Sequence, residues 1–459
     1  MRRIAVLSAA TVLTAIILAP RAQAQGFAVY EHDPCAMARG GAAVAAPCPG
    51  GSAVFFNPAG IISAGKPWNL EANLTLIMPR GSFLDSASQT KTNLVKATYP
   101  VPAGYFTRQL GPRAAVGIGG FAPYGLTTEW PVNFQGRFLG YKTQLSAFYI
   151  QPTFAYQVAS GFQIGVGVDY VTAAAKVRRH VDASTLPAPS PAPAGTYLAN
   201  LGMPVGTDFA DALFDVTGTG WGGHIGVMWQ ASTKLSFGIR YMTQVKVNFT
   251  GKATFTPVPT GITLAAGNPF GVPGGTPLDA VLASAFTTSL ANQNASTTIT
   301  MPAQLVVGLA YAVTPQFKVM ADYQYTDWTV FKSLDLKLDA ANLVISEYEH
   351  YIASNAFRAG VEWQATNGLA LRCGILTHKG AAPDETVTPI LPEGQRMEGT
   401  LGAGVNLTSG LRLDLAYQYI YQGDRRGRMV DSPTPTPALN HGIFAFTANL
   451  FGASLALAF

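Results

Sequence analysis

The sequence is poor in charged residues. Asp, Glu, Lys and Arg make up 12% of its 459 residues, whereas soluble domains carry about 25%. A soluble chain of this length would be expected to form about three domains. The formal net charge of +5 falls to +2 when the three arginines of a leader (Arg2, Arg3 and Arg21) are removed. This balance excludes nucleic acid as an expected partner.

Sequence signatures of catalysis and metal binding are also missing. The chain has no Gly-x-Ser-x-Gly, His-x-x-x-His or Cys-x-x-Cys spacing. Gly218 to Gly223 match the dinucleotide fingerprint by letter, but an apolar run and a tight turn follow instead of a helix, so a strand is predicted there. We therefore expect no enzyme, no cofactor and no metal. An outer-membrane lipid hydrolase with Ser and His on different strands is an alternative that spacing alone leaves open.

Cysteine is scarce, with three residues in the whole chain. In an oxidising compartment Cys35 and Cys48 could form a disulfide, and two free thiols are the equal alternative. Cys373 lies in a predicted strand and is expected to be unpaired.

Long apolar runs suited to a membrane-spanning helix are absent after the leader. Residues 1–24 have the pattern of a secretory signal peptide, with two early arginines, an apolar run from Ile4 to Ala19 and the small-residue site Ala22-Gln23-Ala24. A membrane anchor is the less favoured alternative, because the run is short and ends at Pro20. The protein is therefore expected to be exported.

What the sequence does contain is alternation. From Trp68 to Met78, apolar side chains fall on one side of an extended chain and Asn69, Glu71 and Asn73 on the other. Eleven residues, tilted, match the roughly 9 to 11 that a strand needs to cross a bilayer. Similar segments predict fourteen strands: Trp68–Met78, Ala97–Arg108, Arg113–Tyr124, Thr143–Val158, Phe162–Arg178, Val216–Trp229, Lys234–Thr250, Thr298–Val313, Phe317–Phe331, Tyr351–Gln364, Leu369–Thr377, Arg396–Leu407, Leu411–Tyr421 and His441–Phe459.

The connections between these segments alternate between short turns and long loops. Turns such as Gln109–Pro112 are followed by loops such as Gly125–Lys142, throughout the chain. Short turns at one end, long loops at the other and an even strand count are typical of bacterial outer-membrane barrels. The predicted fold is thus all-β, a transmembrane antiparallel β-barrel of 14 strands over residues 66–459.

The N-terminal segment has no such period. Residues 25–65 are rich in Gly and Ala and cannot form a core alone. Fourteen strands enclose a lumen, since eight leave room only for side chains. We predict that residues 25–65 fold into it as a hatch.

Short motifs are distributed along the chain at Gly26-Phe27, Ser52–Gly60 with Asn57-Pro58-Ala59, Phe121–Leu126, Thr128–Pro131, Gly136-Arg137, Asp322–Trp328, Pro383-Asp384, Thr388-Pro389, Leu391-Pro392, Arg396 and Leu401–Gly404. Taken together, they resemble the FadL family of outer-membrane transporters of long-chain fatty acids and aromatic hydrocarbons. The resemblance covers nearly the whole mature chain, with gaps in the two longest loops. It implies a fourteen-stranded barrel with a hatch at Asn57, Pro58 and Ala59.

The third predicted strand contains Gly119, Gly120 and Pro123, residues that mark a bulge or a lost ladder bond. A rim bulge without a role is one interpretation. The resemblance favours another, in which cargo leaves sideways through a kink in this strand. Lateral exit is also physically favourable, because a hydrocarbon gains about 0.8 kcal/mol per CH₂ on leaving water.

Two loops carry apolar residues that suit cargo capture. Leu278, Val281, Leu282, Ala285 and Phe286 recur at helical spacing. Packing between loops explains the stripe equally well, but on the outside of a barrel it could form one wall of a groove. The resemblance implies an opposite wall from the preceding loop, formed by Leu198, Leu201, Met203, Phe209, Leu213 and Phe214.

Arg179, after Arg178, ends the fifth predicted strand. Exposed strand ends usually carry solvated charges, but the resemblance aligns Arg179 with a basic residue that binds the cargo carboxylate. Arginine suits that role because it stays charged and holds both oxygens. Where fatty-acid members place a second cation, this chain has Ser354 and Asn355 before Arg358.

Together these observations predict a passive outer-membrane channel for hydrophobic molecules, long-chain fatty acids in the first place. Uncharged aromatic hydrocarbons are the alternative cargo, and a general porin is a rival that the predicted hatch argues against. The expected partners are the cargo and the lipid and lipopolysaccharide of the outer membrane. The channel is expected to act as a monomer.

Overall fold

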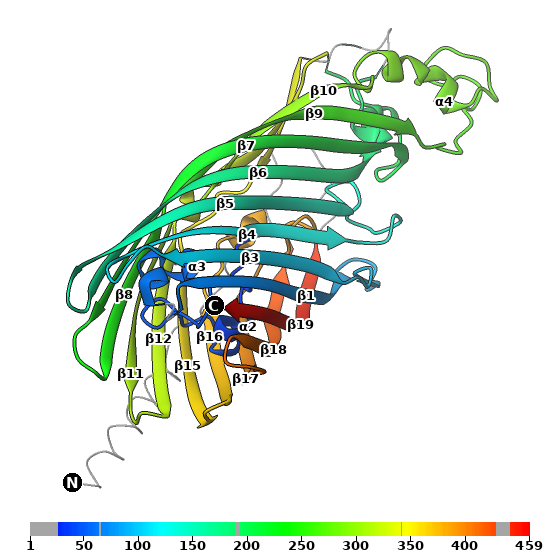
Figure 1. The fold of residues 1–459 in the computed structure, drawn as a ribbon. Helices are drawn as coiled ribbons and strands as arrows, with labels where there is room; N and C mark the ends of the chain where they lie inside the picture. The colour runs from blue at the N-terminus through cyan, green and yellow to red at the C-terminus, as the bar shows by residue number, and fades with distance from the viewer. Residues whose placement is uncertain (1–25, 64–65, 189–192, 194, 341, 428–440) are drawn as a thin grey trace.

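The structure, a computed structural model, describes residues 26–63, 66–188, 193, 195–340, 342–427 and 441–459. One antiparallel sheet curls round and encloses the N-terminal segment (Figure 1). It closes where the first strand pairs with the last, from Asn69 opposite Ala458 to Asp85 opposite Gly442. Within the described ranges, no helix has the length and apolarity needed to cross a membrane. The predicted signal peptide lies outside the described residues.

The predicted fourteen-stranded barrel is confirmed. Two of the wall strands are each divided by a short break, and three further short strands, β2 (Lys91–Asn93), β13 (Ser333–Leu338) and β14 (Leu343–Tyr348), belong to loops. The wall consists of β1 (Trp68–Asp85), β3 (Tyr99–Gln109), β4 (Ala114–Glu129), β5 (Lys142–Ala159), β6 (Phe162–Asp182), β7 (Asp208–Gln230), β8 and β9 (Leu235–Met242 and Val245–Pro257), β10 and β11 (Gln293–Met301 and Gln304–Ala312), β12 (Phe317–Thr326), β15 (Ser354–Thr366), β16 (Leu369–His378), β17 (Arg396–Asn406), β18 (Leu411–Arg426) and β19 (Gly442–Ala458).

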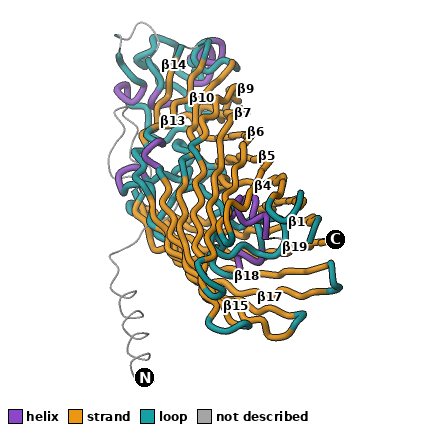
Figure 2. Tube along the Cα trace, turned by 60° about the vertical axis from the view of Figure 1, so that its left-hand side comes forward, coloured by secondary structure: helices purple, strands orange, loops and turns teal. Residues whose placement is uncertain are grey.

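Alternation along the strands separates the two faces of the wall. On β1, Glu71 and Asn73 point into the lumen and are buried, while Leu70 and Leu74 point outward and are about half exposed. An outward apolar face and an inward polar face are what a barrel in lipid requires. Figure 2 shows the loop strands β13 and β14 extending one end of the barrel beside β9 and β10.

The divided strands correct the predictions of two continuous ones, Lys234–Thr250 and Thr298–Val313. The breaks face each other, because Met242 pairs with Gln304 below them and Val245 pairs with Met301 above them. Pro302 lies in one break and has no N–H for the ladder, which explains the interruption.

Other predicted boundaries also differ: the first strand, for example, ends at Asp85 instead of Met78, and two further differences affect residues discussed below. The strand predicted to reach Phe331 ends at Thr326, and a short 3₁₀ helix, η5 (Trp328–Val330), follows because Trp328 and Phe331 turn inward onto Phe27 of the hatch. β7 begins at Asp208 instead of Val216, and buried and partly exposed residues alternate along the added part from Ala210 onward. Phe209, Leu213 and Phe214 therefore belong to a strand, not to a loop.

The N-terminal segment fills the lumen as predicted. Its elements are α2 (Pro34–Ala38), α3 (Ala53–Phe56) and η1 (Pro58–Ser63), and every residue of α2 and α3 is buried. Cys35 and Cys48 form a disulfide across 13 positions, which selects one of the two alternatives for these cysteines.

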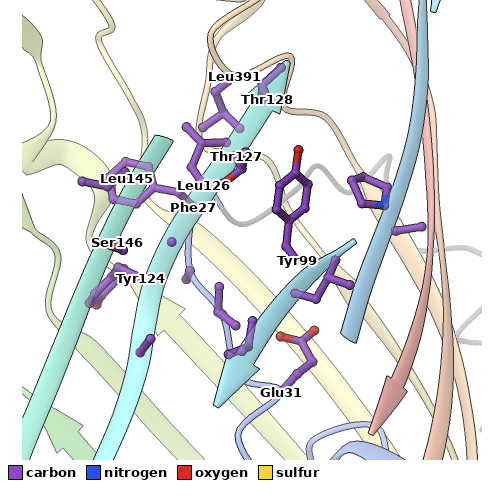
Figure 3. A pocket seen from close by; sticks show the side chains of 18 of the residues that line it. Phe27, Glu31, Tyr99, Tyr124, Leu126, Thr127, Thr128, Leu145, Ser146 and Leu391 are labelled. Carbon is purple, nitrogen blue, oxygen red and sulfur yellow. The ribbon is translucent and has the colours of Figure 1, made fainter. Parts of the chain in front are cut away.

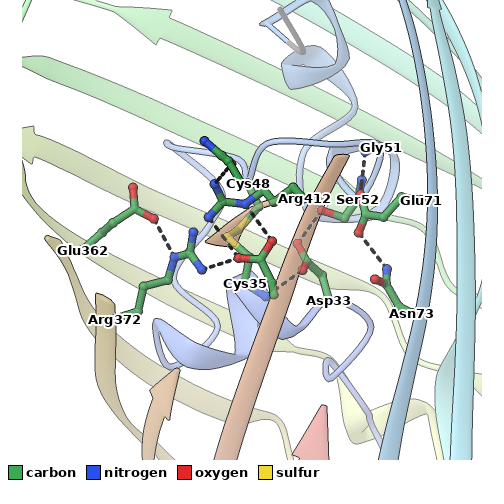
Figure 4. A network of polar contacts seen from close by, with 12 residues as sticks. Asp33, Cys35, Cys48, Gly51, Ser52, Glu71, Asn73, Glu362, Arg372 and Arg412 are labelled. Carbon is green, nitrogen blue, oxygen red and sulfur yellow. Dashed lines mark hydrogen bonds and ion pairs between the residues drawn. A yellow bond between two sulfur atoms is a disulfide. The ribbon is translucent and has the colours of Figure 1, made fainter. Parts of the chain in front are cut away.

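Charged groups of the wall hold the hatch in place (Figure 4). Glu71 of β1 accepts hydrogen bonds from the backbone N–H of Gly51 (2.6 Å) and Ser52 (3.2 Å). On the opposite side, Arg39 of the hatch forms an ion pair with Glu362 of β15. Glu362 also binds Arg372, whose own second partner is Asp414 at 2.5 Å. Because removing one partner of a buried ion pair costs about 3–5 kcal/mol, the disulfide-bonded half of the hatch is firmly seated.

The hatch disulfide leads to a prediction for the cysteines. Alkylation of the denatured, unreduced protein should modify Cys373 alone, and all three cysteines after reduction, as read by mass spectrometry. The double variant Cys35→Ser, Cys48→Ser should lose about 2–4 kcal/mol of local stability, because the unfolded hatch regains loop entropy. Hydrogen exchange in residues 33–50 should therefore accelerate, while Cys373→Ser serves as the unaffected control. Modification of all three cysteines without reductant would contradict the prediction.

Candidate functional site

The wall has a gap between β3 and β4. Their pairing ends at Gly104 opposite Gly120. Beyond this point β3 still pairs with β1 as far as Tyr99, and β4 still pairs with β5 as far as Glu129. The two strands therefore separate toward the end that carries the long loops, while each keeps its outer neighbour.

A bulge in β4 accompanies the gap. Between Phe121 and Tyr124, two residues, Ala122 and Pro123, stand opposite the single residue Phe148 of β5. A bulge of this kind bends the strand and increases its twist. The glycine at position 119 is needed for packing, since a Cβ there would come within 2.9 Å of Val54 of the hatch.

β3 contains a second sequence signal for the gap. The prediction of a kink used only residues of β4 and did not include it. Pro100 and Pro102 lie in the part of β3 where its pairing with β4 is lost. Proline cannot donate to a ladder and is confined to strand edges. The two prolines thus indicate that this part of β3 borders an opening.

The start of the hatch takes up the free edge of β4. Val29 donates its backbone N–H to the carbonyl of Pro123 (2.9 Å), and Gly125 donates to the carbonyl of Phe27 (2.9 Å). Ala28 forms an isolated antiparallel bridge with Tyr124. The hatch therefore replaces, from inside, the pairing that β3 no longer provides.

A carboxylate fixes the residue before this short pairing. Glu393, in the loop before β17, accepts the N–H of Gly26 at 2.5 Å and also those of Ala381 and Ala382. Burial raises the pKa of Glu393. The beginning of the hatch is thus held by backbone hydrogen bonds and one loop carboxylate.

A cavity of about 420 Å³ lies at the gap, and we call it the gap cavity. Its size falls in the range of ligand pockets, about 300–1,000 Å³. Figure 3 shows side chains from β3, β4, β5 and the hatch around it. Its lining includes the apolar residues Ile77, Pro79, Leu94, Pro100, Val101, Leu126, Leu145, Leu391, Ile420 and Leu450.

A second, smaller cavity of about 60 Å³ lies against the loop strand β13, and we call it the inner pocket. Most of the side chains that line it are apolar, among them Phe214 and Leu334. Phe27 and Leu126 line both cavities. Phe27 contacts the rings of Trp328 (4.5 Å between centroids) and Phe331 (5.7 Å). Leu145 and Leu391 also line both cavities, so Phe27 is one of four side chains that lie between the inner pocket and the gap cavity.

The predicted hatch residues press against the opposite wall. Asn57 donates its side-chain amide to the carbonyls of Val44 (2.7 Å) and Val227 (3.0 Å). A Cβ at position 226 would come within 2.9 Å of the backbone of Pro58, so glycine permits this close approach. Ala59 donates its N–H to Asn57 Oδ1 (3.1 Å).

The loops contain a groove of about 380 Å³, but only part of the predicted set lines it. Leu198, Leu201 and Met203 form one side, as expected, while residues 262–270 form the other. In the predicted helical stripe, Leu278 and Leu282 are buried and pack within the loop. Val281 and Phe286 are partly buried, and Phe286 packs on Phe209 at 5.1 Å. Phe214 lines the inner pocket instead of the groove.

Arg179 lies within β6, three residues before its end, and forms an ion pair with Glu347 of β14 at 3.2 Å. Gly218–Gly223 lie within β7, as predicted, and do not precede a helix.

The carboxyl group of Glu31, which can gain or lose a proton, lies in the lining of the gap cavity. Its Oε1 accepts from Gln418 (3.0 Å), which also binds Glu398 of β17, and Glu398 accepts from the hydroxyl of Tyr30 (3.1 Å). Burial, and then the negative charge of Glu398, raises the pKa of Glu31 to about 7.

Comparison with known proteins gives consistent matches. A family profile described as "Outer membrane protein transport protein (OMPP1/FadL/TodX)" matches residues 15–459. Outer membrane protein P1 of Haemophilus influenzae is 24% identical, covering 82% of this chain and 78% of that protein. The long-chain fatty acid transport protein of Escherichia coli is 23% identical, covering 90% of each chain.

Solved structures show the same fold. A FadL homologue from Pseudomonas aeruginosa superposes with a TM-score of 0.78 at 18% identity, covering 95% of this chain and all of that one. The toluene transporter TodX of Pseudomonas putida superposes with a TM-score of 0.68 at 17% identity, covering 94% and 99%.

The raised pKa of Glu31 predicts that the hatch is seated less firmly as pH rises. When the start of the hatch leaves its seat, Glu31 returns to water and to an ordinary pKa of 4.5. The seated state therefore binds more protons between pH 4.5 and about 7, and its stability falls as pH rises through this window, by at most about 1.4 kcal/mol per pH unit. Hydrogen exchange of residues 26–33, corrected for intrinsic rates, should show lower protection at higher pH. Glu31→Gln should remove this dependence, and protection that rises with pH would contradict it.

Proposed function

Because the chain belongs to the FadL/TodX family of outer-membrane transport proteins, non-enzymatic channels for hydrophobic compounds, we propose that its cargo is a long-chain fatty acid that leaves sideways between β3 and β4. The observation that carries this proposal is the gap itself, with a ligand-sized apolar cavity on its inner side. An apolar chain moving through the gap passes from cavity to lipid without entering water, which would cost about 0.8 kcal/mol per CH₂.

The route we propose begins at the loops. The groove beside Leu201 captures the chain from water. The inner pocket, at about 60 Å³, must widen to admit the chain next. Movement of Phe27 then joins the inner pocket to the gap cavity. On this route Arg179 exchanges its partner Glu347 for the cargo carboxylate, because both are carboxylates and the arginine remains paired.

Aromatic hydrocarbons are the alternative cargo, suggested by the toluene transporter among the similar structures. The ion pair of Arg179 with Glu347 favours them, since a neutral molecule would not need to displace Glu347. Uptake of labelled oleate and labelled toluene by cells that produce the protein distinguishes the two. Oleate uptake above that of cells without the protein supports the proposal, and uptake of toluene alone contradicts it.

Removing the bulge should test the lateral exit. Deletion of Pro123 leaves one residue opposite Phe148 and restores a regular β4–β5 register without turning later side chains to the wrong face. We expect oleate uptake to fall by about tenfold or more, because β4 straightens toward β3. The matched control is deletion of Ala365, which removes the bulge of β15 away from the gap cavity and should leave uptake within about twofold. Equal uptake by wild type and the Pro123 deletion, with both barrels folded, would refute lateral exit.

A further inference from the structure

Arg396 stands out among the residues that line the gap cavity. It is the first residue of β17 and carries the cavity's guanidinium group. Within the described part of the chain it forms no ion pair, and its Nε has no hydrogen-bond partner. Its guanidinium carbon lies 5.5 Å from the centroid of the Phe446 ring. A partly buried, unpaired cation in a ligand-sized cavity calls for an anionic partner.

Two carboxylates lie close to Arg396 but have donors of their own. Glu393 accepts the backbone N–H groups of Gly26, Ala381 and Ala382. Glu398 binds His378 at 3.2 Å and accepts from Tyr30. Neither reaches the guanidinium within ion-pair distance. Glu31, the carboxyl group that lines the same cavity, accepts from Gln418 and forms no ion pair with Arg396 within the described residues. The guanidinium donors therefore remain available to a molecule in the cavity.

The rest of the cavity suits an alkyl chain. One side of the cavity is apolar and is formed by Ile77 and Pro79 of β1 and Leu450 of β19. The apolar surface continues to the gap through Pro100 and Phe148. Phe148 is 37% exposed on the outer face, so the apolar surface reaches the lipid side of the wall. Arg396 lies on β17, on the far side of β1 and β19 from the gap. The guanidinium of the cavity thus lies away from the gap, and the end that opens is lined by apolar side chains and uncharged hydroxyl groups, such as Thr127 and Ser146.

Building on the function proposed above, we propose that Arg396 binds the carboxylate of an anionic amphiphile in the gap cavity, so that the alkyl chain enters the lipid first. A charge at the centre of a bilayer costs about 2.5–3.5 kcal/mol on insertion scales. Tail-first exit postpones that cost until the chain is already in lipid. The guanidinium holds both carboxylate oxygens during this step, a geometry that lysine does not match.

The test compares two ligands of equal chain length, oleate and oleyl alcohol, bound to purified protein in detergent. Arg396→Gln should weaken oleate binding by about tenfold, or about 1.4 kcal/mol, and leave oleyl alcohol within about twofold. Arg396→Lys should recover part of the oleate affinity. Arg80→Gln is the matched control, because Arg80 lies on β1 beside the cavity without lining it. Heat-modifiable mobility in gels verifies that each barrel is folded.

Photo-crosslinking locates the chain. A fatty acid with a diazirine near its methyl end should label residues 100–102, 122 and 148, and one with the diazirine near the carboxyl group should label β17 and β18. Equal loss of oleate and oleyl alcohol in Arg396→Gln, unchanged oleate binding, or the reverse labelling pattern would overturn the proposal. Wild-type cells that take up neither oleate nor toluene would instead overturn the transport function on which it rests.

Discussion

Every backbone N–H and C=O of a wall in lipid needs a partner, and the gap between β3 and β4 is where this requirement shapes the molecule. On the β3 side, Pro100 and Pro102 reduce the number of donors that need one. On the β4 side, residues 27–29 of the hatch supply the missing partners. The start of the hatch is thus both a plug and a substitute for a strand segment. Withdrawing it leaves backbone groups of β4 unpaired, at about 1–3 kcal/mol for each buried group.

The hatch is held unevenly along its length. Its disulfide-bonded half is seated by the ion pair of Arg39 with Glu362 and by the hydrogen bond from the N–H of Gly51 to Glu71. Its first residues depend on two backbone hydrogen bonds with β4 and on Glu393. Removing a partner from a buried ion pair costs several kcal/mol, so the two parts differ in how easily they move. On the proposed route, opening therefore involves a shift of Phe27 and its neighbours, while the disulfide-bonded half stays in place.

The barrel could be predicted from the sequence, since fourteen alternating segments joined by alternating short turns and long loops are compatible with few other folds. The hatch could be predicted as well, because residues 25–65 cannot form a core of their own. Local patterns failed where tertiary contacts decide. The strand expected to reach Phe331 stops earlier because Trp328 packs on Phe27, a partner about 300 positions away in the chain. At the gap, the glycines of β4 identified one edge from the sequence. The role of Pro100 and Pro102 becomes visible only in the structure, where the pairing of β3 with β4 ends at Gly104, before these prolines are reached. The pairing of the hatch with β4 has no sequence signal, because it depends on where the barrel places the chain.

Transport along the proposed route needs no energy source. An alkyl chain leaves water when the loops capture it, and this step supplies the hydrophobic gain of about 0.8 kcal/mol per CH₂. Each later compartment, the inner pocket, the gap cavity and the bilayer, is also apolar, so the chain moves between environments of similar free energy. The bilayer is by far the largest of them, and dilution into it gives the direction. What the protein controls is then the rate, through the ring of Phe27 and the hydrogen bonds that hold residues 27–29 on β4.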